Sequence, residues 1–189
     1  MSRGLGDVYK RQLKILVTVT LVCNLVALLL VPGMSLMKGP EELLALAPYE
    51  NPLEIPLRVG LVFVLSWGWV WTAGVYEVVL TLFLLFCGIC TAIILWQGRR
   101  VLGTILTGAP FRAENGVSLR RAAVCCFLIA AAALARVVWG LFYYGSVAPL
   151  LTYNALFVPI FILGGLLCLV MSALFRQAAE LKAENDLTI

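Results

Sequence analysis

The sequence contains no histidine and carries few charges. Only 13% of its 189 residues are charged, whereas a soluble domain carries about 25%. Without imidazole groups, the chain cannot build a histidine-ligated zinc centre or a Ser-His-Asp triad from its own side chains. We therefore expect no catalytic residue of these kinds, no metal and no cofactor.

Long apolar runs dominate instead, and 62% of the residues are hydrophobic. Residues 59–98 contain a single formal charge, that of Glu77. As one helix this stretch would be about 60 Å long, roughly twice the hydrocarbon core of a bilayer. Few soluble folds contain such a run. We predict an all-α polytopic membrane protein surrounded by the lipid bilayer.

Four segments have the length and hydropathy of transmembrane helices, and we expect them to form a four-helix bundle. The predicted spans are residues 13–34, 74–98, 122–144 and 150–175. The remaining segments are an outer loop (35–73), a basic cytoplasmic loop (99–121), an outer turn (145–149) and a cytoplasmic tail (176–189). Pro32 and Gly33 are expected to close the first helix.

Residues 57–71 are short for a span and end in three tryptophans, Trp67, Trp69 and Trp71. Because indole rings favour the membrane–water boundary, we interpret this segment as interfacial or half-inserted. A full crossing would give five spans and an outside N-terminus, and this alternative stays open.

The distribution of charge predicts the orientation. The loop at 99–121 holds five arginines and one glutamate, and positive residues beside spans stay in the cytoplasm. The stretch at 35–58 has a net charge of −2 and would lie outside. We predict an N-in/C-in protein of the bacterial cytoplasmic (inner) membrane that makes no direct contact with nucleic acid.

Residues 7–12, Asp-Val-Tyr-Lys-Arg-Gln, resemble the translation of a transposon-end adapter used in sequencing libraries. We interpret residues 1–12 as a leader that is foreign to the natural protein, and we expect the natural start to be missing. A natural basic leader is the alternative.

Cys87 and Cys90 form a C-x-x-C pair inside the second predicted span. In an exposed loop this spacing is typical of thiol–disulfide exchange, because the second thiol resolves the first. Inside an apolar helix, burial favours the neutral thiol over the reactive thiolate. Packing between helices is therefore the simpler interpretation of this pair.

Glu77 and Arg136 lie toward the outer ends of the second and third spans. Charges at such depth usually face a partner or a water-filled cavity. An ion pair between Glu77 and Arg136 would satisfy both side chains, either as a contact between helices or as a site for a ligand or ion.

Small residues recur every four positions in two spans. They are Ala122, Cys126 and Ala130 in the third span and Gly164, Cys168 and Ser172 in the fourth. Such faces let helices approach closely in lipid, within the bundle or in a homodimer.

Distinctive polar residues cluster in the cytoplasmic segments. We expect Ser118 to cap the third helix, Pro110 and Gly116 to bound a turn, and Asn185 to end the fourth helix. The candidate partner-binding residues are Pro110, Phe111, Glu114, Asn115, Glu184, Asn185, Asp186 and Leu187.

These segments carry a resemblance. With the motif P-F-x-x-E-N at residues 110–115 and the ending E-N-D-L-T-I at 184–189, the chain is similar to a bacterial family of small four-span membrane proteins of unknown function. The resemblance covers most of residues 13–189. It implies a regulatory pairing with a helix-turn-helix protein, because members often appear beside such regulators, and it implies no catalytic residues.

We therefore predict a non-enzymatic accessory or signalling protein whose cytoplasmic face binds a partner. Transport or sensing of a small molecule through Glu77 and Arg136 is the first alternative. A membrane thiol oxidoreductase that uses Cys87 and Cys90 is the second.

Overall fold

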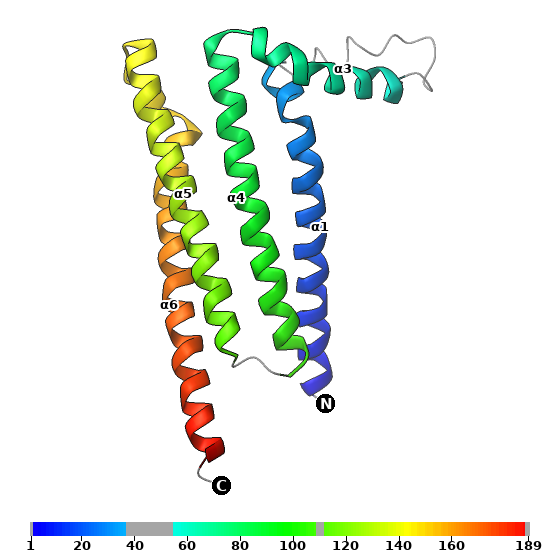
Figure 1. Cartoon of the computed structure of the whole chain (residues 1–189), viewed down its shortest axis with the longest axis vertical. Helices are drawn as coiled ribbons and strands as arrows, with labels where there is room; N and C mark the ends of the chain where they lie inside the picture. Colours follow the sequence, from blue (N-terminus) through cyan, green and yellow to red (C-terminus); the bar gives the residue numbers. More distant parts are fainter. Residues whose placement is uncertain (1, 37–54, 109–111, 188–189) are drawn as a thin grey trace. The chain divides into compact units, whose positions relative to one another are not determined.

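The computed structural model describes residues 2–36, 55–108 and 112–187, and all the regular structure in these ranges is helical. Four helices are long: α1 (Ser2–Leu36), α4 (Val75–Leu106), α5 (Ala113–Tyr144) and α6 (Tyr153–Leu187) (Figure 1). The shorter elements are α3 (Ile55–Trp69) and the 3₁₀ turns η1 (Val70–Thr72) and η2 (Ala148–Leu151). Residues 37–54 of the predicted outer loop lie outside the described residues.

Each long helix contains a segment that is long and apolar enough to cross a membrane. These segments are Arg11–Gly33, Val75–Leu106, Ala113–Tyr144 and Tyr153–Asn185. Their mean hydropathies lie between 2.2 and 2.9, which is high because few charges interrupt them. The predicted all-α class with four spans is confirmed, and the N-in/C-in orientation stays a prediction.

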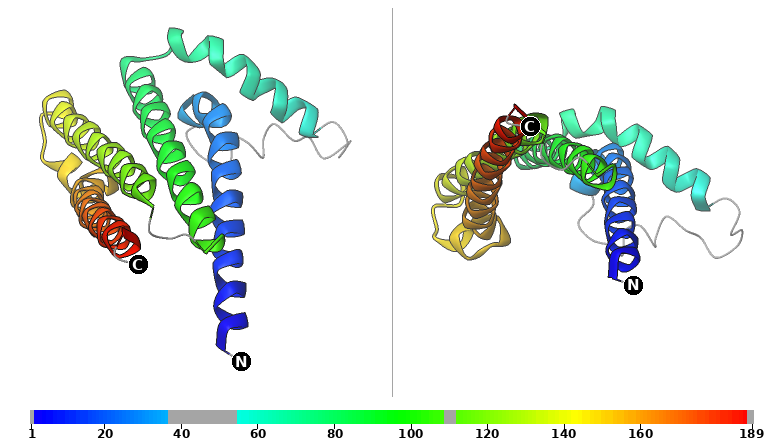
Figure 2. Two further views of the ribbon diagram at one scale, coloured as in Figure 1. Left: turned by 60° about the horizontal axis from the view of Figure 1, so that its bottom comes forward. Right: turned by 90° about the horizontal axis from the view of Figure 1, so that it is seen from below.

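The described helices group into two compact units, a first unit of residues 1–24 and 89–189 and a second unit of residues 25–88. In the first unit, α5 ends at Gly145, whose positive φ of +59° suits a residue without a Cβ atom. The Gly145 N–H donates to the Leu141 carbonyl, η2 follows, and α6 returns antiparallel beside α5 (Figure 2).

Small residues bring α5 and α6 together. Ala122, Cys126 and Ala130 on α5 are each at most 5% exposed. A Cβ atom built on Gly164 would lie 4.0 Å from Cys126 Sγ, and the Cys126 and Cys168 thiols are hydrogen-bonded. The hydrophobic effect does not drive helices together in lipid. Dispersion contacts at this close approach therefore hold α5 and α6 together. The small-residue faces of α5 and α6 thus contact each other within the chain, which is one of the two roles that the sequence left open.

In the second unit, α3 packs against the last turns of α1. The Trp67 Nε1 donates to the Leu29 carbonyl at 3.0 Å, and the Phe63 ring lies against Gly33. With 15 residues, α3 is about 22 Å long, shorter than the hydrocarbon core of about 30 Å. It lies across the direction of the neighbouring turns of α1 and α4 (Figure 1), as an interfacial helix does. Its interfacial position stays a prediction.

The prediction that α1 closes at Pro32 and Gly33 is wrong, because the helix continues to Leu36. A proline lacks the N–H that would continue the ladder, and its ring disturbs the preceding turn. Neighbouring groups stabilise this turn instead: Trp67 bonds the Leu29 carbonyl, and Ser35 Oγ donates to the Pro32 carbonyl at 2.9 Å. The Ser35 and Thr81 hydroxyls are also hydrogen-bonded to each other.

Residues 99–121, which the sequence assigns to a basic cytoplasmic loop between spans, are mostly helical, and their cytoplasmic position stays a prediction. α4 continues to Leu106 and α5 begins at Ala113, because a helix that has left the hydrocarbon tolerates charges on its solvated face. Ser118 and Gly116 therefore lie inside α5 rather than at a cap or a turn, and the N-cap is Arg112.

The predicted end of the fourth helix at Asn185 is also wrong. α6 runs through this residue to Leu187. Asparagine ends a helix when it adopts a left-handed conformation, and the described residues with a positive φ are both glycines.

Candidate functional site

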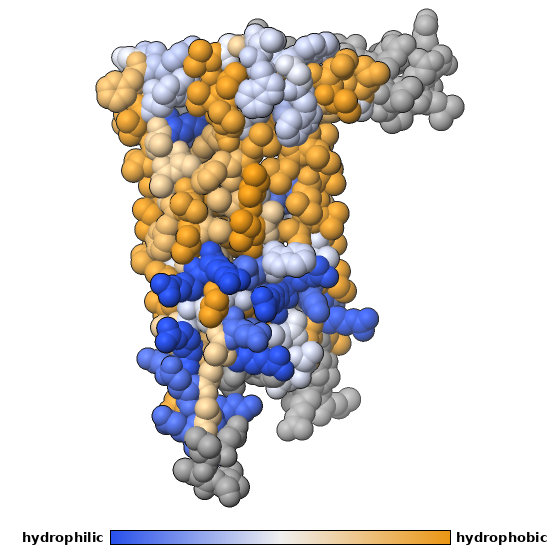
Figure 3. Space-filling model, viewed as in Figure 1, coloured by the Kyte–Doolittle hydropathy of each residue, from blue (hydrophilic) through white to orange (hydrophobic). Residues whose placement is uncertain are grey.

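Six arginines of the first unit gather where α4 ends, α5 begins and α6 leaves its apolar stretch. We call this region the basic end. Its arginines are Arg99 and Arg100 on α4, Arg112, Arg120 and Arg121 at the start of α5, and Arg176 on α6. Figure 3 shows hydrophilic residues gathered beyond the apolar surface of these helices. With 32 residues each, α4 and α5 are about 48 Å long and exceed the hydrocarbon core of about 30 Å.

Asn115 connects the start of α5 with the end of α4. Its Nδ2 donates to Thr104 Oγ1 at 2.7 Å, and its Oδ1 lies 3.0 Å from the same hydroxyl. The Asn115 side chain is 1% exposed. A buried amide is costly unless it is hydrogen-bonded, so these contacts fix how the two helices meet.

Gly116, the next residue, connects α5 with α6. Ser172 Oγ donates to the Gly116 carbonyl at 2.7 Å. A Cβ atom built on Gly116 would lie 2.8 Å from Arg176 Cγ and 3.1 Å from the Ser172 carbonyl oxygen. Glycine therefore permits a closer approach of the two helices than any other residue would allow. Asn115 and Gly116 together join the start of α5 to the end of α4 and to α6 near Ser172.

The charged residues around this core are exposed. Arg100 Nη2 lies 3.5 Å from Glu114 Oε2, with side chains 52% and 65% exposed. Arg176 Nη2 lies 4.0 Å from Glu180 Oε1, one turn further along α6. Exposed ion pairs contribute at most about 1 kcal/mol to stability, so these charges remain available to a partner.

The structure divides the predicted partner-binding residues into different environments. Glu114, Glu184 and Asn185 are exposed, whereas Asn115 is buried between helices. Pro110 and Phe111 lie outside the described residues, and Asp186 and Leu187 are described only as the last residues of α6. Their role in partner binding stays a prediction.

The sequence did not indicate that Thr104, Gly116 and Ser172 hold the basic end together. Ser172 was found only as a member of the small-residue face of α6. The sequence feature that could have indicated these contacts is the pair Asn115-Gly116. It places a side-chain amide next to a residue without a side chain, near the start of a long helix. Its partners lie 11 residues earlier and 56 residues later, too far apart to be found from local spacing.

Arg136 has a partner that the sequence did not indicate. Its Nη1 donates to Asn154 Oδ1 at 3.1 Å, across the hairpin of α5 and α6. A hydrogen bond of this kind offsets part of the cost of placing a cation in an apolar helix.

Glu77 lies in the first turn of α4, in the second unit. Its carboxylate folds back over Gly74, and a Cβ atom built on Gly74 would lie 2.5 Å from Glu77 Oε2. A negative charge in the first helical turn is favourable because the backbone N–H groups there point toward it. Glu77 therefore has a local structural role, and its ion pair with Arg136 stays a prediction.

Three cysteines of the first unit are buried, namely Cys90, Cys125 and Cys126. Cys90 on α4 is hydrogen-bonded to Cys125 on α5, and both are buried. All six cysteines lie in the described residues, and all are free thiols. The described residues contain no group of histidines, cysteines or carboxylates that could hold a metal ion. Redox chemistry at Cys87 and Cys90 stays a prediction.

Comparison with known proteins gives one match. A family model described as "Protein of unknown function (DUF2975)" matches residues 64–189, more than half of the chain. The match includes α4, α5 and α6, and therefore all six arginines of the basic end. Comparisons with curated proteins and with solved structures found no match.

Proposed function

The chain belongs to the DUF2975 family of proteins of unknown function, and we propose that it is a non-enzymatic accessory protein of a signalling system. In this proposal it spans the bacterial inner membrane and binds a cytoplasmic protein through the last turns of α6, beside its basic end. The basic end faces the cytoplasm because arginines beside membrane spans stay on that side.

The observation that carries this proposal is the contrast between core and surface at the basic end. Short hydrogen bonds join the end of α4 to the start of α5, through Thr104 and Asn115, and the start of α5 to α6, through Gly116 and Ser172. The surrounding charged side chains are exposed and stand on helices whose backbones are fixed. Such a surface loses little conformational entropy when a partner binds, and preorganisation of this kind favours affinity.

The end of α6 indicates the kind of partner. Glu180 and Glu184 are exposed and lie four residues apart, so they share one face of the helix. This acidic face would attract a basic surface. A helix-turn-helix regulator presents such a surface to DNA, so its capture by α6 would keep it away from DNA.

Reversing the acidic face is expected to abolish capture of the partner. We expect the variant E180K/E184K, and a chain that ends at Arg176, to lose a crosslinked partner that the full chain captures in native membranes. The E180K/E184K variant should keep the thermal stability of the full chain, because both changed residues are exposed. The measurement is quantitative mass spectrometry of crosslinked complexes purified from equal amounts of membrane protein.

Lys182 provides the matched control, since it is exposed on the same helix but about 200° around it from Glu180 and Glu184. K182E also reverses a charge in the tail and should keep the partner. Equal capture by the full chain, the truncated chain and the E180K/E184K variant would contradict the proposal.

A small-molecule site at Arg136 is the alternative function. The hydrogen bond between Arg136 and Asn154 favours it, because it places polar groups within otherwise apolar helices. Reversing both charges, in E77R/R136E, separates a structural role from a site. Recovery of the stability that each single reversal loses would indicate a structural ion pair. A folded double variant without ligand-dependent stabilisation would favour the site.

A further inference from the structure

Two adjoining grooves lie between the early turns of α1 and the last turns of α4, within the first unit. They meet at Lys14, which lines both, and have volumes of about 620 Å³ and 450 Å³. The residues that line the first are Arg11, Lys14, Ile15, Thr18, Val19 and Leu106. The residues that line the second are Lys14, Trp96, Arg99, Arg100 and Gly103.

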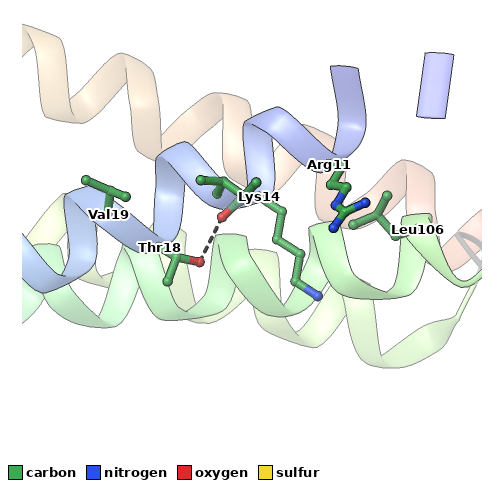
Figure 4. Close-up of a pocket in the computed structure, with 6 residues that line it drawn as sticks. Arg11, Lys14, Thr18, Val19 and Leu106 are labelled. Atoms are coloured by element: carbon green, nitrogen blue, oxygen red, sulfur yellow. Dashed lines mark hydrogen bonds between the residues drawn. The ribbon is translucent and has the colours of Figure 1, made fainter. Parts of the chain in front are cut away.

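Every ionisable residue that lines these grooves is a cation. Lys14 reaches from α1 toward α4, and its Nζ lies 3.7 Å from the position that a Cβ atom of Gly103 would occupy (Figure 4). The missing side chain at Gly103 leaves room for the ammonium group beside the arginines of α4. Arg99 and Arg100 add two guanidinium groups, which bind phosphate oxygens well because several N–H donors lie in one plane.

The grooves also have an apolar side, formed by Ile15, Val19 and Leu106. Trp96 is 56% exposed, and the Arg99 guanidinium lies 5.9 Å from its ring centre. An exposed indole beside a cation at the end of an apolar helix is typical of the level of lipid headgroups. Cations and apolar side chains therefore meet where a phospholipid changes from headgroup to acyl chain.

We propose that these grooves bind an anionic phospholipid, with its phosphate at Lys14, Arg99 and Arg100 and an acyl chain along Ile15 and Val19. A free phosphate ion could bind the same cations as the headgroup. It has no acyl chain, so it would leave the apolar side of the grooves uncovered. Arg11 lies in the stretch that resembles a translated adapter (residues 7–12), so the proposed site depends on the other three cations. Basic pockets between transmembrane helices suit anionic headgroups for the same reason. This site is independent of the partner surface on α6.

The test is lipid retention by the full chain purified in detergent, measured by native mass spectrometry. We expect phosphatidylglycerol to be retained in preference to phosphatidylcholine. Replacing three cations, in K14Q/R99Q/R100Q, should abolish this preference, with an about fivefold loss of affinity for each charge removed. Inorganic phosphate should displace phosphatidylglycerol poorly, because it lacks the acyl chain.

The matched control is R112Q/R120Q/R121Q, which removes the same number of charges from the basic end but lines neither groove. It should retain phosphatidylglycerol as the natural chain does. Equal loss in both triple variants, equal retention of the two lipids, or displacement by inorganic phosphate as effective as displacement by lipid would each overturn the proposal. If the first triple variant fails to fold, R100Q decides the question, because Arg100 is more than half exposed and its change tolerable.

Discussion

Replacing Gly116 with valine is expected to force the start of α5 away from α6 near Ser172. A Cβ atom at this position would already lie 3.1 Å from the Ser172 carbonyl oxygen, which belongs to the backbone and cannot turn aside. The further methyl groups of valine would also break the bond between Ser172 Oγ and the Gly116 carbonyl. We expect a loss of about 1–3 kcal/mol in the free energy of unfolding. Thermal unfolding in detergent, followed by circular dichroism, measures it.

Gly98 offers the control, because it also lies inside a long helix and nothing is within 4 Å of a Cβ atom built on it. G98V makes the same change in helix propensity without the collision. The unfolding midpoint should therefore fall much further for G116V than for G98V. Equal midpoints would show that the close approach of α5 and α6 at Gly116 contributes nothing to stability.

The four spans could be predicted because hydropathy is a local property. About 20 uncharged residues in succession can only be satisfied in lipid as a helix, whatever the rest of the chain does. The α5–α6 contact was also predictable, since Ala122, Cys126 and Ala130 recur at the helical period and small residues in spans have few other uses.

The ends of the helices were not predictable in the same way. Arg99 and Arg100 indicated the end of the second span, but a charge marks where a helix leaves the hydrocarbon rather than where it stops. The continuation of α4 to Leu106 depends on contacts of Thr104 with a different helix. Pro32 was a comparable case, because its turn is stabilised by Trp67, from a segment 35 residues later.

Asn115 shows how a residue can be identified while its role is missed. The sequence marked it as distinctive and assigned it to partner binding, since a polar residue beyond a span is usually solvated. The structure buries it, because Thr104 supplies both a donor and an acceptor. Arg136 is similar: its depth was apparent from the sequence, but its partner Asn154 comes from the register of α5 against α6.

Replacing Asn115 with leucine is expected to destabilise the basic end by about 1 kcal/mol, because the half-buried Thr104 hydroxyl loses its amide partner and keeps only its bond to the Val101 carbonyl. T104V should cost a similar amount. The double variant T104V/N115L should cost less than the sum of the two, since neither residue then leaves a polar group without its partner. Thermal unfolding of the unsubstituted chain, N115L, T104V and T104V/N115L gives the coupling free energy between the two residues. Additive losses would contradict the hydrogen-bonded pair.

The same four chains decide whether Asn115 touches the partner or positions the surface that does. If Asn115 is a positioning residue, N115L should lose partner capture together with stability, and T104V/N115L should regain both. If its amide contacts the partner directly, the double variant should regain stability and still fail to capture. The E180K/E184K variant is the reference for a direct contact in the same assay, because it should lose partner capture while keeping its stability. We expect Asn115 to follow the first pattern, because a side chain that is 1% exposed has no surface to offer.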